Sequence, residues 1–540
     1  MVPSFSYSTQ GVSPPVTGTT GSMSVASGAR RGHAEDVSKN TFWFCLSMAC
    51  TVFMVTLGLS MLMILNSGAR DINERNLETK TPVGADDAGF RAGGLNEIVA
   101  PPTSATSTQK AQTNDNGDWP PATWTKVSPT GIPGRKSTTT TTQRPLPPGS
   151  LLCTVSEGFD VDSYVPAPDG LCAITVFDSL YTPDGSKLTP PYNEDFELFL
   201  DTARGSEKTE YAIGFDATST MRNDTAMELL VRNMTTTNFL DYFWERNRIY
   251  HYAQVNAPIR STTMSAATSV EYAARGLEMI SSLMYYKKSP KDRPSYTIIF
   301  HTVYSNRNGE LIAEKLRAFP VDIFVVIAYH TEADNWYTDC RLIPPTILSS
   351  DLLDSPFNKS LYPVRLADSI YHLQHRHELW PSTTTYAVAV GLGGRWYTPY
   401  HSDFIPDKPG NYSLGHRCRP RKPTEDDQIT NIAEACTDPS LNNTFQVDSV
   451  YEATFTYNKS ERLFFTYDSA TNLRTKLCRT KANMTKLKYT LAAGDVQYED
   501  ASNACGDGSF PRLRMLKKLA HFFAFTYKSS SERHRCMSIK

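Results

Sequence analysis

The chain lacks the charge excess that many binding classes require. Its 540 residues carry 54 Lys and Arg against 56 Asp and Glu, a net charge of −2, and charged residues make up only 20% of the sequence. A nucleic-acid-binding protein is usually marked by a large cationic surface, and the bulk charge gives no sign of one. The composition therefore gives no support to a nucleic-acid partner.

Nucleotide-binding motifs are also missing. The most conspicuous glycine-rich stretch, TYAVAVGLGGRWYTPY (385–400), lacks the Lys-Ser/Thr that completes a phosphate-binding loop. A dinucleotide-binding loop must open a helix, and the bulky Arg-Trp-Tyr-Thr-Pro after these glycines does not start one. We therefore expect a strand that delivers aromatic side chains, and we predict no cofactor.

The zinc motif H-E-x-x-H is absent as well. The pattern closest to it is HLQHRHE (372–378), in which His372 and His375 would share one face of a helix. His377 would point to another side of that helix, so the three imidazoles do not converge. We interpret the segment as a solvated helix end and predict no metal site.

Long apolar runs are scarce, with one exception at Phe42–Leu65. This stretch, FWFCLSMACTVFMVTLGLSMLMIL, contains no charged residue. A helix of this length can cross a hydrocarbon core of about 30 Å, and it has no polar face, unlike a buried helix of a soluble protein. The run is too long for a cleaved signal peptide and follows some forty polar residues. We predict a single transmembrane helix over 42–65.

Flanking charges, sequons and cysteines orient this helix. Arg30, Arg31 and Lys39 precede it, which favours a cytoplasmic amino terminus. Eight cysteines follow it, an even number that suggests disulfides in an oxidising compartment and allows 105 complete pairings. We predict a single-pass type II membrane protein whose carboxy-terminal part is luminal or extracellular. All N-glycosylation sequons follow the helix, at Asn223, Asn233, Asn358, Asn411, Asn442, Asn458 and Asn483.

Low-complexity segments lie on both sides of the predicted helix. Residues 1–41 are rich in Ser, Thr, Gly and Pro, and we predict a disordered cytoplasmic tail. Residues 66–150 contain PPTSATSTQ and KSTTTTTQRPLPPG, a composition typical of an extended, disordered stalk that can carry O-glycans. Globular patterning covers 151–525, and we expect a basic carboxy-terminal tail over 526–540.

Short β-branched runs alternate with helical patterns in the globular part. Several runs are apolar throughout, as in parallel strands covered on both faces. The helical patterns lie at 269–286, 309–319 and 365–380. The alternation indicates an α/β fold, a (β/α)8 TIM barrel over 151–525, with an open doubly wound sheet as the alternative. The expected strands are 171–181, 210–216, 248–258, 295–305, 321–330, 385–392, 462–468 and 489–500.

Three stretches in the second half of the globular part follow one another in the order in which a known protein family has them. GLGGRWYTP (391–399), YDSATNLRTK (467–476) and AAGDVQYEDASNACG (492–506) resemble the last strands of glycoside hydrolase family 18, the chitinases and chitinase-like lectins. DIFVVIAYHTEADNW (322–336) resembles the family's strand D-x-x-x-V-M-T-Y-D. The chain is also similar to a group of membrane-anchored chitinase-like proteins of ticks. The resemblance implies that the first of these stretches is a single late barrel strand.

The start of the globular part resembles the same family. CTVSEGFDVDSYVPAPDGLCAITVFDSLY (153–181) is similar to the family's first strand, a loop, and a cysteine before the second core element. The resemblance implies a disulfide between Cys153 and Cys172.

The family's chemistry requires residues that can be sought in this chain. Its hydrolysis is substrate-assisted, because the sugar's N-acetyl oxygen attacks the anomeric carbon. The acid and the acetamide-orienting aspartate come from D-x-x-D-x-D-x-E on the fourth strand, whose alternate residues share a face at the barrel mouth. The stretch in that place, RIYHYAQVNAP (248–258), contains no carboxylate. Tyr329 matches the family's acetamide-contacting tyrosine, but His330 replaces the Asp that usually follows it.

A barrel without these carboxylates loses catalytic contributions that are typically about 10²–10⁴-fold each. We therefore predict a catalytically inactive, chitinase-like ectodomain that binds a chitin-like or N-acetylglucosamine-containing glycan, or a protein partner. An active hydrolase with a non-standard acid and an adhesion module without sugar binding are the alternatives. Packing of Trp396 and Tyr397 under a loop would remove both from a ligand site. The candidate ligand contacts are Tyr329, Arg395, Trp396, Tyr397 and Asp495.

Overall fold

The computed structural model describes most of the chain beyond residue 145. The predicted tail 1–41, the predicted transmembrane helix 42–65 and nearly all of the stalk lie outside these residues. Within the part of the chain that is described, no helix combines the length and apolarity needed to cross a bilayer. The described ranges are 146–181, 188–217, 224–255, 257, 265–288, 293–330, 339–400, 411–419, 429–441, 444–483 and 487–540.

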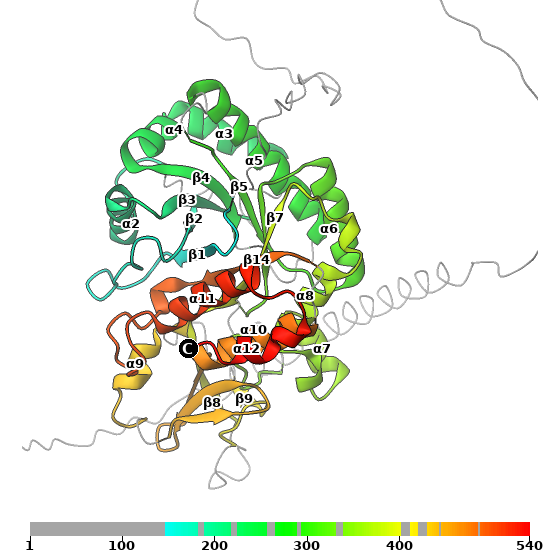
Figure 1. Ribbon diagram of the computed structural model, residues 1–540. Coiled ribbons are helices and arrows are strands. Elements are labelled where there is room, and N and C mark those ends of the chain that lie inside the picture. The colour runs from blue at the N-terminus through cyan, green and yellow to red at the C-terminus, as the bar shows by residue number, and fades with distance from the viewer. Residues whose placement is uncertain are drawn as a thin grey trace, which may run out of the picture. The chain divides into compact units, whose positions relative to one another are not determined.

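Eight parallel strands among the described residues close into a barrel (Figure 1). The last strand closes it by pairing with both the first strand and the seventh. This arrangement confirms the predicted (β/α)8 barrel and excludes the open doubly wound sheet. The barrel strands are β1 (Leu151–Ser156), β2 (Ile174–Tyr181), β3 (Glu210–Asp216), β4 (Ile249–Val255), β5 (Thr297–His301), β6 (Ile323–Ile327), β7 (Thr385–Gly391) and β14 (Tyr489–Gly494).

Helices cover the outside of the barrel (Figure 1). The predicted segment 269–286 is part of α5, whose Val270, Leu277 and Ile280 are buried at helical spacing. The predicted segment 365–380 contains a helix that ends at Gln374. The helices are α2 (Glu194–Gly205), α3 (Asp224–Thr236), α4 (Phe239–Asp241), α5 (Ala266–Lys288), α6 (Asn306–Ala318), α8 (Leu366–Gln374), α10 (Ala470–Asn483) and α11 (Pro511–Phe525).

Alternation along the strands divides the apolar side chains between two cores. Ala253 of β4 and Val325 of β6 belong to the cluster inside the barrel. Their neighbours Tyr252 and Phe324 belong to the larger cluster that includes side chains of the surrounding helices. A polar or acidic side chain at an inner position near a strand's carboxyl end is therefore directed to the barrel mouth.

A second, antiparallel sheet is inserted between β7 and β14, in the order β10-β8-β13-β12-β11, with β9 paired to β8. Two sequence predictions are wrong here. The run 462–468 contains β13 of this sheet and not a barrel strand. The stretch 391–399 is not one strand, because the barrel strand ends at Gly391 and the second sheet begins at Gly394. The strands are β8 (Gly394–Pro399), β9 (Cys418–Arg419), β10 (Ile429–Thr430), β11 (Gln446–Asp448), β12 (Ala453–Asn458) and β13 (Leu463–Tyr467).

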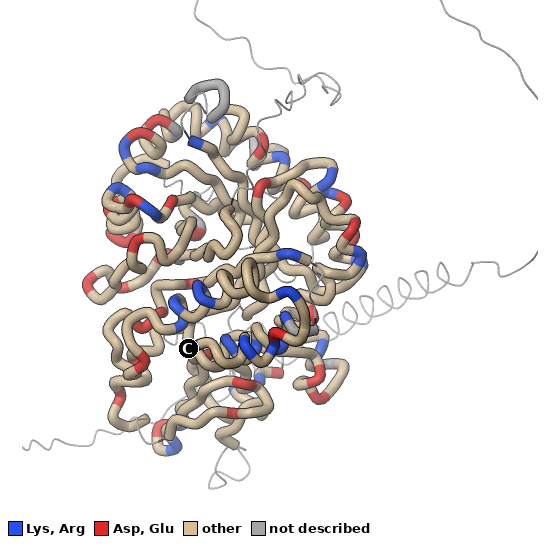
Figure 2. Tube along the Cα trace, viewed as in Figure 1, with Lys and Arg blue, Asp and Glu red and all other residues tan. Residues whose placement is uncertain are grey.

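The carboxy-terminal residues are folded, which corrects the predicted basic tail over 526–540. They form a short 3-10 turn and the helix α12 (Arg533–Met537), and Cys536 is fully buried. Figure 2 shows basic residues along α11 and α12, so the basic residues near the carboxy terminus lie on helices. A disulfide to Cys478 of α10 holds this segment in place.

The eight cysteines of the globular part form four disulfides. One of them joins Cys153 to Cys172, the pair that the family resemblance implied. Disulfides persist mainly in oxidising compartments. The other three are Cys340–Cys418, Cys436–Cys505 and Cys478–Cys536.

Candidate functional site

The carboxyl ends of the barrel strands bring together acidic and hydroxyl side chains. Asp178 of β2 and Asp216 of β3 share strand faces with interior residues and are nearly buried. Tyr329 lies just beyond β6, and Asp495 directly follows β14. These four residues contribute to the described part of the barrel mouth. The loops after β2, β3, β4 and β6 contain stretches outside the described residues, at 182–187, 218–223, 258–264 and 331–338.

Tyr329 occupies the middle of the mouth because two glycines make room for it. A Cβ atom at Gly391 would lie 2.5 Å from Cδ2 of the Tyr329 ring, and one at Gly494 would contact the hydroxyl group. The ring thus lies against the ends of β7 and β14. Burial raises the pKa of Tyr329, and the negative charges of Asp495 and Asp178 raise it further. The hydroxyl stays protonated at neutral pH and can donate a hydrogen bond.

Asp495 is a partly buried acid on an unusual backbone. Its φ is 59°, in the left-handed region that few residues other than glycine adopt. Ser156 Oγ donates a hydrogen bond of 2.7 Å to its carboxylate, and its own amide donates to Thr154 Oγ1 at 3.0 Å. Burial raises the pKa of Asp495, and the bond from Ser156 opposes that rise. Such combinations of burial and backbone strain occur preferentially at functional sites.

The fourth strand contributes no carboxylate to the mouth. Its inner face carries Ala253 and Val255, both in the apolar cluster inside the barrel. Gln254 belongs to the alternate face, and its Nε2 donates to the carbonyl of Val255 at 2.6 Å. Glu245, the nearest acid before the strand, is exposed and precedes its amino end. The structure therefore places β4 within the stretch 248–258, which contains no carboxylate.

His330 does not replace the charge of the aspartate that the family has after the tyrosine. The side chain is 2% exposed, and its ring lies 5.5 Å from that of Tyr362. Burial lowers the pKa of His330 to about 3, and the positive charges of Arg395 and Arg365 contribute. The imidazole is therefore neutral at physiological pH.

Arg395 and Tyr397 are structural, which contradicts their prediction as ligand contacts. Both belong to β8 of the inserted sheet and are 1% and 0% exposed. Arg395 Nε donates to the Tyr397 hydroxyl at 3.0 Å, and Nη1 donates to the carbonyl of His330 at 3.3 Å. The Tyr397 hydroxyl in turn donates to the carbonyl of Ile343 at 3.0 Å. Together they join the inserted sheet to the segment after β6.

Trp396 is packed, as the alternative interpretation of the sequence allowed. Its ring lies 4.5 Å from that of Phe465 on the neighbouring strand. Its Nε1 donates to Thr430 Oγ1 at 2.9 Å. The side chain is partly buried beside the cluster that contains Ile432. Of the five predicted contacts, only Tyr329 and Asp495 meet at the barrel mouth.

A second polar group, which the sequence did not reveal, lies at the amino ends of the barrel strands. Tyr296 donates its amide to His251 Nδ1 at 3.1 Å, so Nε2 carries the proton and donates to Glu210 at 2.8 Å. This bond lowers the pKa of Glu210. Residues at this end of a TIM barrel generally serve stability. The separation of 41 residues between His251 and Glu210 leaves no local motif that could have identified the pair.

The structure separates the predicted sequons by exposure. Asn411 is exposed and Asn233 is half-buried on α3. Asn358 is only 2% exposed, and its amide donates to Asp354, so the structure disfavours a glycan there. Asn458 is 8% exposed, with its Oδ1 accepting from the amide of Ser460 at 3.0 Å. The remaining sequons, Asn223 and Asn442, and the side chain of Asn483, lie outside the described residues.

Comparison with known proteins identifies the fold. No protein-family model and no curated protein sequence matches the chain. An immunomodulatory active chitinase from Trichuris suis has a similar structure, with a TM-score of 0.50 and 9% identity over 68% of this chain and 99% of that one. Catalytic domain 2 of a Group II chitinase from Ostrinia furnacalis has a TM-score of 0.47, with 11% identity over 70% and 97% of the two chains.

A family GH18 chitinase from Chromobacterium violaceum also has a TM-score of 0.47, with 10% identity over 69% of this chain and 72% of that one. The likeness to the Trichuris suis chitinase, with a TM-score of 0.50 at 9% identity, shows a shared fold. The chain therefore has a chitinase-like TIM barrel.

Proposed function

We propose that this chain is a membrane-anchored, chitinase-like protein that binds an N-acetylglucosamine-containing glycan at the barrel mouth and does not hydrolyse it. The observation that carries the proposal is the inner face of β4, where Ala253 and Val255 stand in an apolar cluster. A glycosidic oxygen that leaves a sugar needs a proton from a placed acid. This strand has no acid to supply it.

The binding part of the proposal rests on Tyr329 and Asp495. The protonated Tyr329 hydroxyl can donate to the oxygen of an N-acetyl group. The carboxylate of Asp495 can accept hydrogen bonds from sugar hydroxyl or amide groups. The protein keeps Asp495 partly buried and on a strained backbone, a combination that packing alone does not require. Asp178, close enough to raise the pKa of Tyr329, provides a further acceptor.

The cellular setting of the proposal follows from the sequence and the disulfides. Residues 42–65 would anchor the chain, and the stalk 66–150 would separate the barrel from the bilayer. Four disulfides suit a luminal or extracellular compartment. The predicted similarity to membrane-anchored proteins of ticks belongs to this part of the proposal. If the barrel instead bound a protein partner at its mouth, or served only in adhesion, the stalk would hold it away from the membrane in the same way.

A second candidate function is hydrolysis with Asp495 as the acid. The raised pKa of this carboxyl is the property that a general acid needs near neutral pH. Its place directly after β14, rather than on β4, would make it a non-standard acid. The two candidates differ in whether an N-acetylglucosamine oligomer is cleaved after it binds.

Calorimetric titration of the full-length protein in detergent with N-acetylglucosamine oligomers tests the binding proposal. We expect saturable binding that is weakened about ten-fold by Tyr329→Phe, because the variant removes one hydrogen bond in a buried site. Tyr371→Phe is the matched control, since Tyr371 of α8 is 51% exposed and remote in sequence from the mouth. Equal affinities of Tyr329→Phe and wild type would contradict the proposed site.

A further inference from the structure

A second polar site lies on the inserted part of the chain. It is a groove of about 330 Å³ lined by arginine, tyrosine, asparagine and histidine side chains. None of these residues belongs to the barrel strands, and none was among the predicted ligand contacts. The lining residues are Arg341, Tyr400, Asn411, His416 and Arg417.

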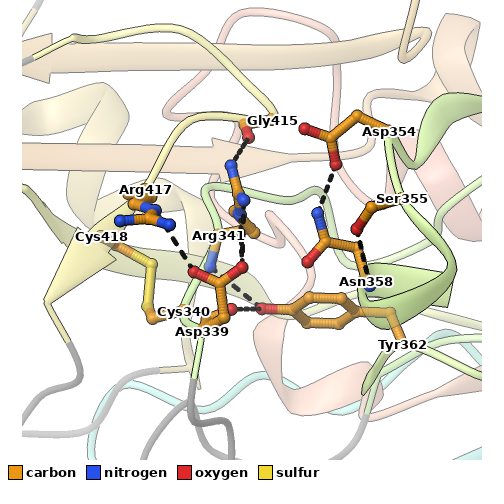
Figure 3. A network of polar contacts seen from close by, with 10 residues as sticks. All are labelled: Asp339, Cys340, Arg341, Asp354, Ser355, Asn358, Tyr362, Gly415, Arg417 and Cys418. Carbon is orange, nitrogen blue, oxygen red and sulfur yellow. Dashed lines mark hydrogen bonds and ion pairs between the residues drawn. A yellow bond between two sulfur atoms is a disulfide. The ribbon is translucent and has the colours of Figure 1, made fainter. Parts of the chain in front are cut away.

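The groove is built on a cross-linked pair of backbone segments. Arg341 and Arg417 face each other in an isolated antiparallel bridge. The disulfide Cys340–Cys418 joins the adjacent positions, and the Cys418 amide donates to the Cys340 carbonyl at 2.9 Å. Figure 3 shows this disulfide directly beside the two arginines. A site fixed in this way loses little conformational freedom when a ligand binds.

One carboxylate orients both arginines. Arg341 donates from Nε and Nη2 to Asp339 at 3.1 and 3.0 Å, and its Nη1 donates to the carbonyl of Gly415 at 3.2 Å (Figure 3). Arg417 Nε lies 3.5 Å from the other carboxylate oxygen of Asp339. The Arg417 side chain is 66% exposed, whereas those of Arg341 and Asp339 are 16% exposed. Two guanidinium groups thus share one carboxylate, and positive charge remains in the groove.

Tyr400 adds an aromatic surface next to this charge. Its side chain is 46% exposed, and its amide donates to the carbonyl of Arg417 at 3.0 Å, which fixes it beside the groove. The guanidinium of Arg419 lies 5.7 Å from the centre of its ring and adds a third positive charge. Asp354, which also appears in Figure 3, accepts from the amide of Asn358 and does not pair with these arginines.

Hydrogen-bonding groups complete the lining. Asn411 Nδ2 donates to His416 Nε2 at 2.9 Å, and both side chains are exposed. An exposed aromatic ring offers a face for a sugar ring, while amide and imidazole groups suit its hydroxyls. A guanidinium held by a fixed carboxylate suits a planar or tetrahedral anion.

We propose that this groove binds an acidic sugar residue, a saccharide that carries a carboxylate or a sulfate group. Its anionic group would bind Arg417, with the charge of Arg341 close by, and its ring would lie against Tyr400. The site is separate from the barrel mouth and does not depend on the glycan proposed there. Carboxylated and sulfated sugars share this chemistry, so the source of the acid is a question for the experiment.

The test uses the full-length protein with Ser413→Ala, which removes the Asn411 sequon and leaves Asn411 in the groove. Calorimetric titrations compare sialylated or uronic-acid oligosaccharides, sulfated oligosaccharides and neutral N-acetylglucosamine oligomers. At least one acidic class should bind with an affinity that Arg417→Ala reduces about ten-fold or more and that added salt also lowers. Arg417→Lys should retain part of the affinity because it keeps the charge but loses the planar fork.

Matched variants separate this groove from other cationic surfaces and from the mouth. Arg376 is 59% exposed and pairs with Glu310, so Arg376→Ala should leave the affinity for acidic sugars unchanged. Tyr400→Phe should keep the affinity, and Tyr400→Ala should lower it. Tyr329→Phe at the mouth should have no effect on acidic sugars.

Three results would overturn the proposal. One is equal affinity for acidic and neutral oligosaccharides with the wild-type groove. Another is loss of acidic-sugar binding in Tyr329→Phe. The third is an equal loss of that binding in Arg417→Ala and Arg376→Ala. Failure of neutral oligomers to bind at all would count against the mouth proposal and not against the groove.

Discussion

Asp495 concentrates the features that make the barrel mouth a candidate site. Its side chain is partly buried, its backbone is left-handed, and its neighbour Gly494 provides the room that Tyr329 needs. Proteins retain such unfavourable local arrangements where function requires them. We therefore predict that Asp495 lowers the stability of the fold at neutral pH.

The substitution Asp495→Asn tests this prediction. Between the ordinary pKa of 3.8 and the raised pKa of the folded state, the folded protein binds more protons than the unfolded one. Stability therefore falls as the pH rises through that range. Asn keeps an acceptor for Ser156 and tolerates the left-handed backbone. We expect the variant to be more stable than wild type at pH 7, by on the order of 1 kcal/mol.

Urea denaturation of both proteins at several pH values measures the difference. The advantage of Asp495→Asn should shrink as the pH approaches 3.8, because the wild-type carboxyl is then protonated. A variant that is less stable than wild type at pH 7 would show that the carboxylate is stabilising, contrary to the account.

Gly391 is a second residue at which a substitution should have a specific effect. A Cβ atom there would lie 2.5 Å from the Tyr329 ring, which is closer than packed atoms allow. Gly391→Ala should cost about 1–3 kcal/mol of folding stability through overpacking. It should also weaken glycan binding, because Tyr329 must move. Thermal unfolding and titration report the two effects.

Gly205 provides the matched control for this substitution. It ends α2, and no atom beyond its chain neighbours lies within 4 Å of a Cβ placed there. Gly205→Ala should therefore leave stability and binding nearly unchanged. Equal effects of the two substitutions would argue against a close contact between Gly391 and Tyr329.

Single residues of the site were predictable where a motif located them. Tyr329 was predicted because it matches the acetamide-contacting tyrosine of the family that the chain resembles, and Asp495 because it lies in the stretch 492–506 that resembles the family's last strand. Arg395 and Tyr397 were mistaken for ligand contacts because arginine and tyrosine serve equally as buried connectors. The direction in which these two side chains point depends on the pairing of β8 with β13, and no local sequence pattern reveals that pairing.

At the scale of elements, a buried ion pair joins the inserted sheet to α10, one of the helices that cover the barrel. Lys476 of α10 pairs with Asp468, the residue after β13, and both side chains are 0% exposed. Lys476 Nζ also donates to the carbonyl of Thr346 at 2.6 Å, and the Thr346 amide donates to Asp468 at 3.2 Å. Burial lowers the pKa of Lys476, and the charge of Asp468 opposes that change.

Removing one partner of this pair should be strongly destabilising. Lys476→Met leaves the Asp468 carboxylate buried without its cation, and we expect a loss of about 3–5 kcal/mol. The double variant with Asp468→Asn should lose less than Lys476→Met alone, because no charge is then left buried. Chemical denaturation measures both variants.

Lys488→Met serves as the control, since Lys488 is exposed, and it should change stability by no more than about 0.5 kcal/mol. A loss in Lys476→Met no larger than in this control would contradict the assigned role of the pair.

Apolar periodicity predicted most helices and strands, but it could not show to which sheet a strand belongs. The helix α5 and the strands β2 to β7 and β14 follow from apolar spacing and β-branched runs. The segment 462–468 has an equally apolar pattern, yet it forms an antiparallel strand in the inserted sheet. Burial on both faces produces the same pattern in both settings, so the sequence could not separate them.

At the scale of the whole molecule, disulfides tie distant parts of the chain to the barrel. The Cys478–Cys536 bond spans 58 residues and holds α12 against α10. The sequence predicted only a basic tail there, because the pairing of Cys536 cannot be deduced from spacing.

The double variant Cys478→Ser with Cys536→Ser should be less stable by about 2–4 kcal/mol. Limited proteolysis should then cleave the chain near residue 530 before the barrel is cut. The double variant Cys340→Ser with Cys418→Ser should instead loosen the groove and leave the carboxy terminus protected. Identical proteolytic patterns for the two double variants would contradict these separate roles.

The central claim is that this barrel binds a glycan at its mouth without cleaving it. Incubation of the full-length protein with an N-acetylglucosamine hexamer, at saturating concentration and with mass analysis of the sugar over days, tests this claim most directly. We expect the hexamer to bind and to be recovered intact, because β4 presents Ala253 and Val255 in place of an acid. Shorter oligomers that appear with wild type and disappear with Asp495→Asn would contradict it and identify a hydrolase.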